Sequence, residues 1–191
     1  MKKITVLDGG MGREIKLRMP NFDPILWSAT ALIHDQSLVK DIHIEFINAG
    51  ANIIITNNYM VVPYVLEAKG MMSDFELLTR LSGELAMQAV IDSKKSGVKI
   101  AGSLPPLTTT YRADLVSKDN EFFVETYKKM IQCLAPNVDL FIAESLSSIV
   151  ELENIVAATE GIDKPLFVSF ILDDKYPTQL LDGTPVSDMV Q

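Results

Sequence analysis

The sequence of 191 residues lacks most features of secreted and membrane proteins. It contains one cysteine, Cys133, so the chain cannot form an internal disulfide or, alone, a metal site of several thiolates. Its apolar runs fall short of the roughly 18–20 residues of a membrane span. The segment after Met1 is too short for the apolar core of a signal peptide. These absences predict a cytoplasmic protein.

Positive charge is also scarce, with 17 Lys and Arg against 25 Asp and Glu, a net charge of −8. This balance argues against a broad nucleic-acid surface, so we expect neither nucleic-acid nor membrane partners. The 48% hydrophobic and 22% charged residues are typical of a folded chain. No linker or low-complexity tract divides the sequence, which therefore predicts one folded unit.

Short apolar runs alternate with helical patterns along the chain. The runs predict strands over residues 4–7, 52–56, 98–101, 138–143 and 166–170. Helices are predicted over residues 35–50, 73–95, 119–134 and 147–159, each beginning near a Ser or Asp. Residues 18–34 contain two prolines and little periodicity, which predicts a loop. Thr184-Pro185 predicts the start of a further helix.

Strands that are apolar on both faces and separated by helices are typical of a parallel sheet covered by helices. Two architectures fit: a complete doubly wound sheet of five strands, or the first part of a (β/α)8 barrel of about 250 residues. The G-x-G-x-x-G fingerprint of dinucleotide-binding folds is absent. The helix start at Thr184-Pro185, close to the last residue, favours an α/β fold that is an incomplete (β/α)8 TIM-type barrel, about the first five βα units.

Two carboxylates follow predicted strands, at the edge where parallel sheets bind ligands. Asp8 follows the first strand and Glu144 follows the fourth. Together they could hold an amino-acid ammonium, share acid–base work or help to bind a metal. The alternative is that each caps a helix. Gly9-Gly10-Met11-Gly12 could offer amides to a ligand carboxylate, or form a plain tight turn.

Two further residues with reactive side chains have structural interpretations. Cys133 lies at a helical position beside Met130, Ile131 and Leu134, which predicts a buried thiol. His43 lies between Ile42 and Ile44 on the first long helix, which favours a packing role over a catalytic one.

Several motifs resemble the homocysteine S-methyltransferase family, in register from residue 4 to about residue 185. The opening motif is Leu7-Asp8-Gly9-Gly10-Met11-Gly12-Arg13-Glu14. Further matching segments are Leu26-Trp27-Ser28-Ala29, Ala49-Gly50-Ala51-Asn52-Ile53-Ile54, Thr56-Asn57-Asn58-Tyr59, Ala101-Gly102-Ser103-Leu104-Pro105-Pro106 and Phe141-Ile142-Ala143-Glu144-Ser145. In the last of these, serine replaces the usual threonine.

The resemblance implies a (β/α)8 barrel that transfers a methyl group to the thiol of homocysteine, as in methionine biosynthesis. In the family, a zinc ion held by three cysteines activates that thiol. The motifs that supply those cysteines would lie beyond residue 191, and Cys133 matches none of them. Residues 1–191 would therefore be the N-terminal part of a homocysteine-binding domain, without bound zinc and inactive alone.

The resemblance also implies substrate-binding roles. Asp8 and Glu144 would bind the homocysteine ammonium, and Gly9 would meet its carboxylate. Gly10 would be a further substrate-binding residue, and Thr56 and Asn57 would line the pocket. Trp27 would lie near the methyl donor, and its segment favours S-methylmethionine or S-adenosylmethionine.

An unclosed barrel leaves sheet edges bare, so a homo-oligomer could cover them. A non-catalytic, truncated module that binds an amino acid or a protein is the alternative to the enzyme.

Overall fold

The computed structural model describes residues 4–116 and 120–189. The α-helices and strands are α1 (Met11–Arg18), α2 (Ala29–His34), α3 (Gln36–Ala49), β1 (Ile53–Ile55), α4 (Pro63–Ala68), α5 (Phe75–Ser93), β2 (Lys99–Leu104), α6 (Asn120–Leu134), β3 (Leu140–Leu146), α7 (Ile149–Ala158) and β4 (Leu166–Phe170). Short 3-10 helices are η1 (Met72–Asp74), η2 (Ala113–Leu115), η3 (Ala135–Asn137) and η4 (Val186–Met189).

The four strands form one parallel sheet in the order β1-β2-β3-β4, with helices in each crossover. An α/β fold with a parallel sheet is therefore confirmed. The strand predicted over residues 4–7 is much reduced, because this segment makes a single parallel bridge, from Leu7 to Ile53. Val6 adds a backbone contact, since its carbonyl accepts hydrogen bonds from the N–H groups of Asn52 and Ile53.

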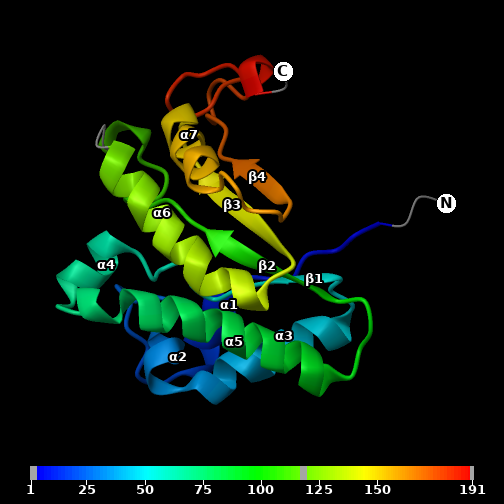
Figure 1. Ribbon diagram of the computed structural model, residues 1–191. Helices are drawn as coiled ribbons and strands as arrows, with labels where there is room; N and C mark the ends of the chain where they lie inside the picture. Colours follow the sequence, from blue (N-terminus) through cyan, green and yellow to red (C-terminus); the bar gives the residue numbers. More distant parts are fainter. Residues whose placement is uncertain (1–3, 117–119, 190–191) are drawn as a thin grey trace.

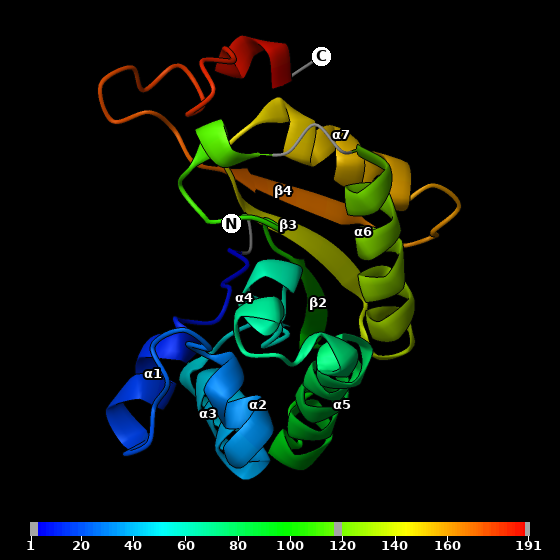
Figure 2. The same cartoon turned by 90° about the vertical axis from the view of Figure 1, so that its left-hand side faces the viewer.

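The helices cover one face of the sheet. Figure 1 shows α3, α5, α6 and α7 following the order of the strands, and Figure 2 shows α6 and α7 beside β3 and β4. The residues that β1, β2 and β3 turn toward these helices include Ile54, Ile100 and Phe141, which are buried in the main apolar core. Burial of such side chains contributes about 1.5–3 kcal/mol each, so this face provides most of the cohesion.

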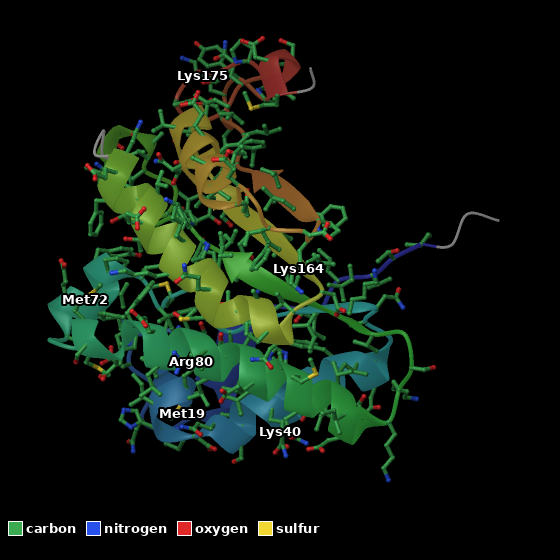
Figure 3. The ribbon with its side chains drawn as sticks, viewed as in Figure 1. Met19, Lys40, Met72, Arg80, Lys164 and Lys175 are labelled. Atoms are coloured by element: carbon green, nitrogen blue, oxygen red, sulfur yellow. The ribbon has the colours of Figure 1, made fainter. Side chains whose placement is uncertain are left out.

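Ion pairs between helices add little to that cohesion. Lys40 of α3 bonds Asp92 of α5 at 2.8 Å, and Arg18 of α1 bonds Glu45 of α3 at 2.7 Å. Figure 3 shows Lys40 on this helical layer. Partly exposed ion pairs contribute about 0–1 kcal/mol each to the free energy of unfolding, so apolar packing rather than these pairs keeps the helices together.

The other face of the sheet is apolar and only partly covered. Ala101, Leu140 and Ile142 form a second, small core there. Beside them lies a cavity of about 670 Å³, which Leu7 and Phe167 also line. These two side chains, at the two edges of the sheet, are 46% and 55% exposed.

Sequence signals placed several element ends correctly. Asp35 caps α3 by accepting a hydrogen bond from the Leu38 N–H, and Gly50 ends it with a φ of 113°. Ser148 and Glu151 form a reciprocal capping box at the start of α7. The strand predicted over residues 166–170 is β4. Asp119, the predicted first residue of α6, lies outside the described residues.

Other predictions were wrong. The predicted loop over residues 18–34 contains α2, and neither α1 nor α4 was predicted. These helices are short, and burial rather than propensity stabilises them, since Ile15 and Leu32 are fully buried. Thr184-Pro185 does not start an α-helix, because Pro185 bridges Gln179 and only η4 follows. Within the described ranges, no helix has the length and hydropathy needed to cross a bilayer.

His43 is buried on α3, as predicted, but it has no polar partner among the described residues. It is fully inaccessible, and neither Nδ1 nor Nε2 makes a hydrogen bond to any residue of those ranges. Burial lowers the pKa of His43 from 6.5 to about 4, because the imidazolium would lose its hydration. The imidazole is therefore neutral in the folded chain. Below about pH 6.5 the histidine binds a proton in the unfolded chain but not in the folded chain, so the free energy of unfolding decreases as pH falls toward about 4.

We expect His43→Leu to remove this acid sensitivity. Between about pH 6.5 and about pH 5, the free energy of unfolding of the wild-type chain should fall by roughly 2 kcal/mol more than that of the variant. Urea denaturation at the two pH values measures the difference. His34→Gln, at an exposed histidine, is the control and should behave as wild type. Equal losses in wild type and His43→Leu would contradict the burial argument.

Candidate functional site

A second cavity, of about 190 Å³, lies beyond the carboxyl ends of β1 and β3. All seven sequence-predicted site residues line it: Asp8, Gly9, Gly10, Trp27, Thr56, Asn57 and Glu144. The lining is completed by Met11, Gly12, Ser28, Ile55 and Tyr59. Parallel pairing explains the convergence, because it brings the carboxyl ends of successive strands to one edge of the sheet.

Asp8 is fixed by the end of β1. Its N–H donates to the Ile53 carbonyl at 3.0 Å, and the Ile55 N–H donates to its Oδ2 at 2.9 Å. Burial, with a smaller contribution from the nearby Glu144 carboxylate, raises the pKa of Asp8 from 3.8 to about 7. The Ile55 hydrogen bond opposes this rise. Asp8 is therefore a carboxyl group that changes charge near neutral pH.

Glu144 comes from an irregular stretch of β3. The register between β3 and β4 shifts between Ala143 and Leu146, and Ser145 has a left-handed φ of 62°. Such bulges re-aim side chains, and they are common next to active sites. Burial raises the pKa of Glu144, while a hydrogen bond from Ser103 lowers it. The Ser103 hydroxyl donates to Oε1 of Glu144 at 2.5 Å.

Beneath the carboxylates, three buried polar residues close a ring of hydrogen bonds. Thr56 Oγ1 donates to Asn58 Oδ1 at 2.6 Å, and Asn58 Nδ2 donates to the Ser103 carbonyl at 3.0 Å. The Ser103 N–H completes the ring by donating to Thr56 Oγ1 at 2.9 Å. Side chains thus continue the β1–β2 ladder past the end of β1. Asn58 belongs to the same sequence motif as Thr56 and Asn57, but the sequence did not predict that it would join these hydrogen bonds.

The N-terminus of α1 points the backbone at the cavity. Gly10 is its N-cap, and the first-turn residues Met11 and Gly12 line the cavity. Gly10 has no side chain to accept the first-turn amides, which carry the positive end of the helix dipole. A helix start of this kind can receive a ligand carboxylate.

Trp27 forms an aromatic wall of the cavity. Its backbone has a left-handed φ of 46°, and a Cβ at position 12 would collide with its indole, so the motif needs Gly12. Phe22 packs edge-on against the ring at 5.2 Å, and Lys16 Nζ lies 5.5 Å from the ring centroid. The indole is therefore held from several sides.

Tyr59 is a lining residue to which the sequence assigned no role. Its hydroxyl lies 3.1 Å from Thr110 Oγ1 and is also hydrogen-bonded to the Ser145 side chain. Burial raises the pKa of this phenol, and Glu144 adds to the rise. Tyr59 is therefore a neutral hydroxyl beside the carboxylates. Its position just after β1 could have marked it as a site residue in the sequence.

The charged lining of the cavity is acidic. Asp8 and Glu144 are its charged lining residues in the described part of the chain, and both have raised pKa values. A buried carboxyl pair with raised pKa values regains its ionised state when an ammonium binds between the two groups. With the α1 amides nearby, the cavity can accept both charges of a zwitterion.

A metal does not fit these residues. The described ranges contain no group of three His, Cys, Asp or Glu side chains that could hold an ion. Cys133 is buried on α6, as predicted, and lies in a groove with Arg80 of α5 rather than in the cavity. Burial raises the pKa of its thiol, which disfavours a metal-binding thiolate.

Comparison with known proteins supports one family. The model of a family described as homocysteine S-methyltransferase matches residues 5–191. Homocysteine S-methyltransferase of Escherichia coli is 28% identical over 98% of this chain and 64% of its own length. Homocysteine S-methyltransferase YbgG of Bacillus subtilis is 25% identical over 97% of this chain and 63% of its own length. The chain spans slightly less than two thirds of these relatives.

Solved structures agree. The metallated form of the homocysteine methyltransferase MmuM from Escherichia coli superposes with a TM-score of 0.86 at 28% identity. The match covers 99% of this chain and 70% of that one. The apo form gives a TM-score of 0.74 at 26% identity, over 99% of this chain and 67% of that one. The parallel α/β fold thus matches that of a TIM-barrel-type enzyme.

The proximity of the two carboxyl groups predicts coupled titration. We expect Asp8 to titrate near pH 7 in the unliganded chain and Glu144→Gln to lower its pKa, because the variant removes a neighbouring negative charge. Carbon-13 NMR of the aspartate carboxyls, with Asp8→Asn to assign the signal, measures both values. Glu153→Gln, an exposed residue of α7, is the control and should change nothing. An Asp8 pKa near 4 would contradict its burial.

Proposed function

Because the chain belongs to the homocysteine S-methyltransferase family, we propose that its cavity binds homocysteine as the acceptor of a methyl group. The reaction of the complete protein yields methionine, so we place it in methionine biosynthesis, in the cytoplasm. The observation that carries this proposal is the buried pair Asp8 and Glu144 beside the N-terminus of α1.

The substrate ammonium would bind between Asp8 and Glu144. Each hydrogen bond to a charged partner contributes about 1.5–3 kcal/mol, and the ammonium also removes the repulsion between the two carboxylates. Because Asp8 has a pKa of about 7, the ammonium competes with a proton below that pH. Homocysteine affinity should therefore rise with pH until both carboxyls are ionised.

The substrate carboxylate would bind the amides of Gly9 and Gly10 at the start of α1. A helix N-terminus stabilises an anion by roughly 0.3–1 kcal/mol, and backbone amides fix its orientation. Asn57 is held to the other wall, because its Nδ2 donates to the Ser28 carbonyl at 3.1 Å. Thr56 and Asn57 then shape the cavity around the side chain of the amino acid. A cavity of about 190 Å³ suits a small ligand.

We propose that the methyl donor approaches from the side of Trp27. The favoured donors, S-methylmethionine and S-adenosylmethionine, are sulfonium cations, and an indole ring beside an acidic cavity attracts a cation. A neutral donor would gain nothing from this charge arrangement.

The zinc of the family would need ligands that this chain lacks. Three thiolates cannot come from a sequence with one cysteine, and Cys133 lies away from the cavity. We therefore propose that these 191 residues bind substrate but do not catalyse methyl transfer alone.

The bare face of the sheet supports the proposal of an incomplete barrel. Leu7 and Phe167 border an apolar cavity of about 670 Å³ on the face opposite the helices. In a (β/α)8 barrel this face is interior and filled by side chains from all eight strands. The remaining strands of a barrel would cover it, and in their absence a second copy of the chain could do so.

We expect Asp8→Asn to weaken homocysteine binding at about pH 8 by at least 10-fold, because the neutral amide cannot balance the ammonium. Isothermal titration calorimetry measures the dissociation constant. 4-Mercaptobutyrate, which lacks the ammonium, should bind the variant no more weakly than it binds the wild-type chain. Asp41→Asn, at an exposed aspartate of α3, is the protein control. Equal homocysteine affinities in wild type and Asp8→Asn would refute the ammonium site.

Zinc titration tests the second part of the proposal. We expect the chain to take up no zinc with the affinity of a three-thiolate site, because it has one cysteine with a raised pKa. Calorimetry, followed by metal analysis after gel filtration, measures uptake. Cys133→Ser serves as the reference for adventitious binding. Stoichiometric zinc retained by the wild-type chain would contradict the expectation.

A further inference from the structure

Ser103 contacts the carboxylate of Glu144 from the neighbouring strand. It lies on β2, on the face of the sheet opposite the helices, while Glu144 comes from the neighbouring β3. Ser103 is fully buried and its hydroxyl donates to Oε1 of Glu144 at 2.5 Å. A hydroxyl that donates to a buried carboxylate is a strong, charge-assisted partner.

The backbone of Ser103 is held from both sides, which fixes the position from which its side chain extends. Its N–H donates to Thr56 Oγ1 and its carbonyl accepts from Asn58 Nδ2, at 2.9 and 3.0 Å. Thr56 and Asn58 are themselves bonded to each other at 2.6 Å. All members of this ring are nearly inaccessible to water, so no solvent molecule competes for these bonds.

We propose that Ser103 is a positioning residue for Glu144: its hydroxyl, on a backbone that is held in place, binds Oε1 and leaves Oε2 free to meet the substrate ammonium. This inference rests on the proposed function for the role of the ammonium. The contact itself does not depend on the ligand. Without it, Glu144 would follow the irregular stretch of β3 around Ser145 with no partner from the neighbouring strand.

The hydroxyl also favours the charged form of Glu144. Burial raises the pKa of this carboxyl, and the Ser103 hydrogen bond is the influence that opposes the rise. The other titratable groups that face Glu144 are Asp8, which precedes α1, and Tyr59, which follows β1. Neither supplies a positive charge. Among the described residues, Ser103 is therefore the partner that lowers the pKa of Glu144 and so favours its ionised form.

The test is the carboxyl titration of Glu144 in the unliganded chain, followed by carbon-13 NMR, with Glu144→Gln to assign the signal. We expect Ser103→Ala to raise the pKa of Glu144, because it removes a hydrogen bond to the carboxylate. Ser103→Cys, with a weaker donor of similar size, should give an intermediate rise. Ser82→Ala removes an equally buried hydroxyl on α5, which donates to the Thr79 carbonyl, and should leave the titration unchanged.

The affinity for homocysteine is the second measurement. Near neutral pH, Ser103→Ala should weaken the affinity about 10-fold, and raising the pH should recover part of the loss. An unchanged pKa of Glu144 in Ser103→Ala overturns the proposal, as does an equal change in Ser82→Ala. If the wild-type chain binds no homocysteine, the proposed function fails, and the NMR titration still decides whether Ser103 controls Glu144.

Discussion

Parallel pairing of β1, β2 and β3 is the constraint on which the site depends. The register places Ser103 of β2 opposite Ile142 of β3, two residues before Glu144. Asp8 reaches the same edge because Leu7 bridges β1 and its own N–H bonds the Ile53 carbonyl. A shift of one residue in this register would turn these side chains to the opposite face of the sheet.

The cavity is assembled from arrangements that cost free energy. Two carboxyls are buried near each other, while Trp27 and Ser145 adopt left-handed backbone conformations that cost on the order of 1–2 kcal/mol each. The apolar core between the sheet and its helices offsets these costs. A site with such preorganised polar groups loses little on meeting a ligand of complementary charge.

Predictions from the sequence succeeded where local chemistry is decisive. Asp35 and Gly50 delimit α3, and Ser148 begins α7, because caps act within one turn of the chain. They failed for α1, α2 and α4, which are short helices whose apolar residues are buried in the main core. All seven proposed site residues line one cavity. Strand ends and the family motifs were the signals that identified them in the sequence.

The sequence by itself determined the α/β class, the family motifs and the lack of cysteines for a three-thiolate zinc site. These are properties of composition and of patterns along the chain. The tertiary structure decided which polar groups share hydrogen bonds, as in the contact of Ser103 with Glu144 and the ring through Asn58. It also decided that burial raises the pKa of Asp8 to about 7. Burial and contacts across strands set those properties, and neither can be read from spacing in one dimension.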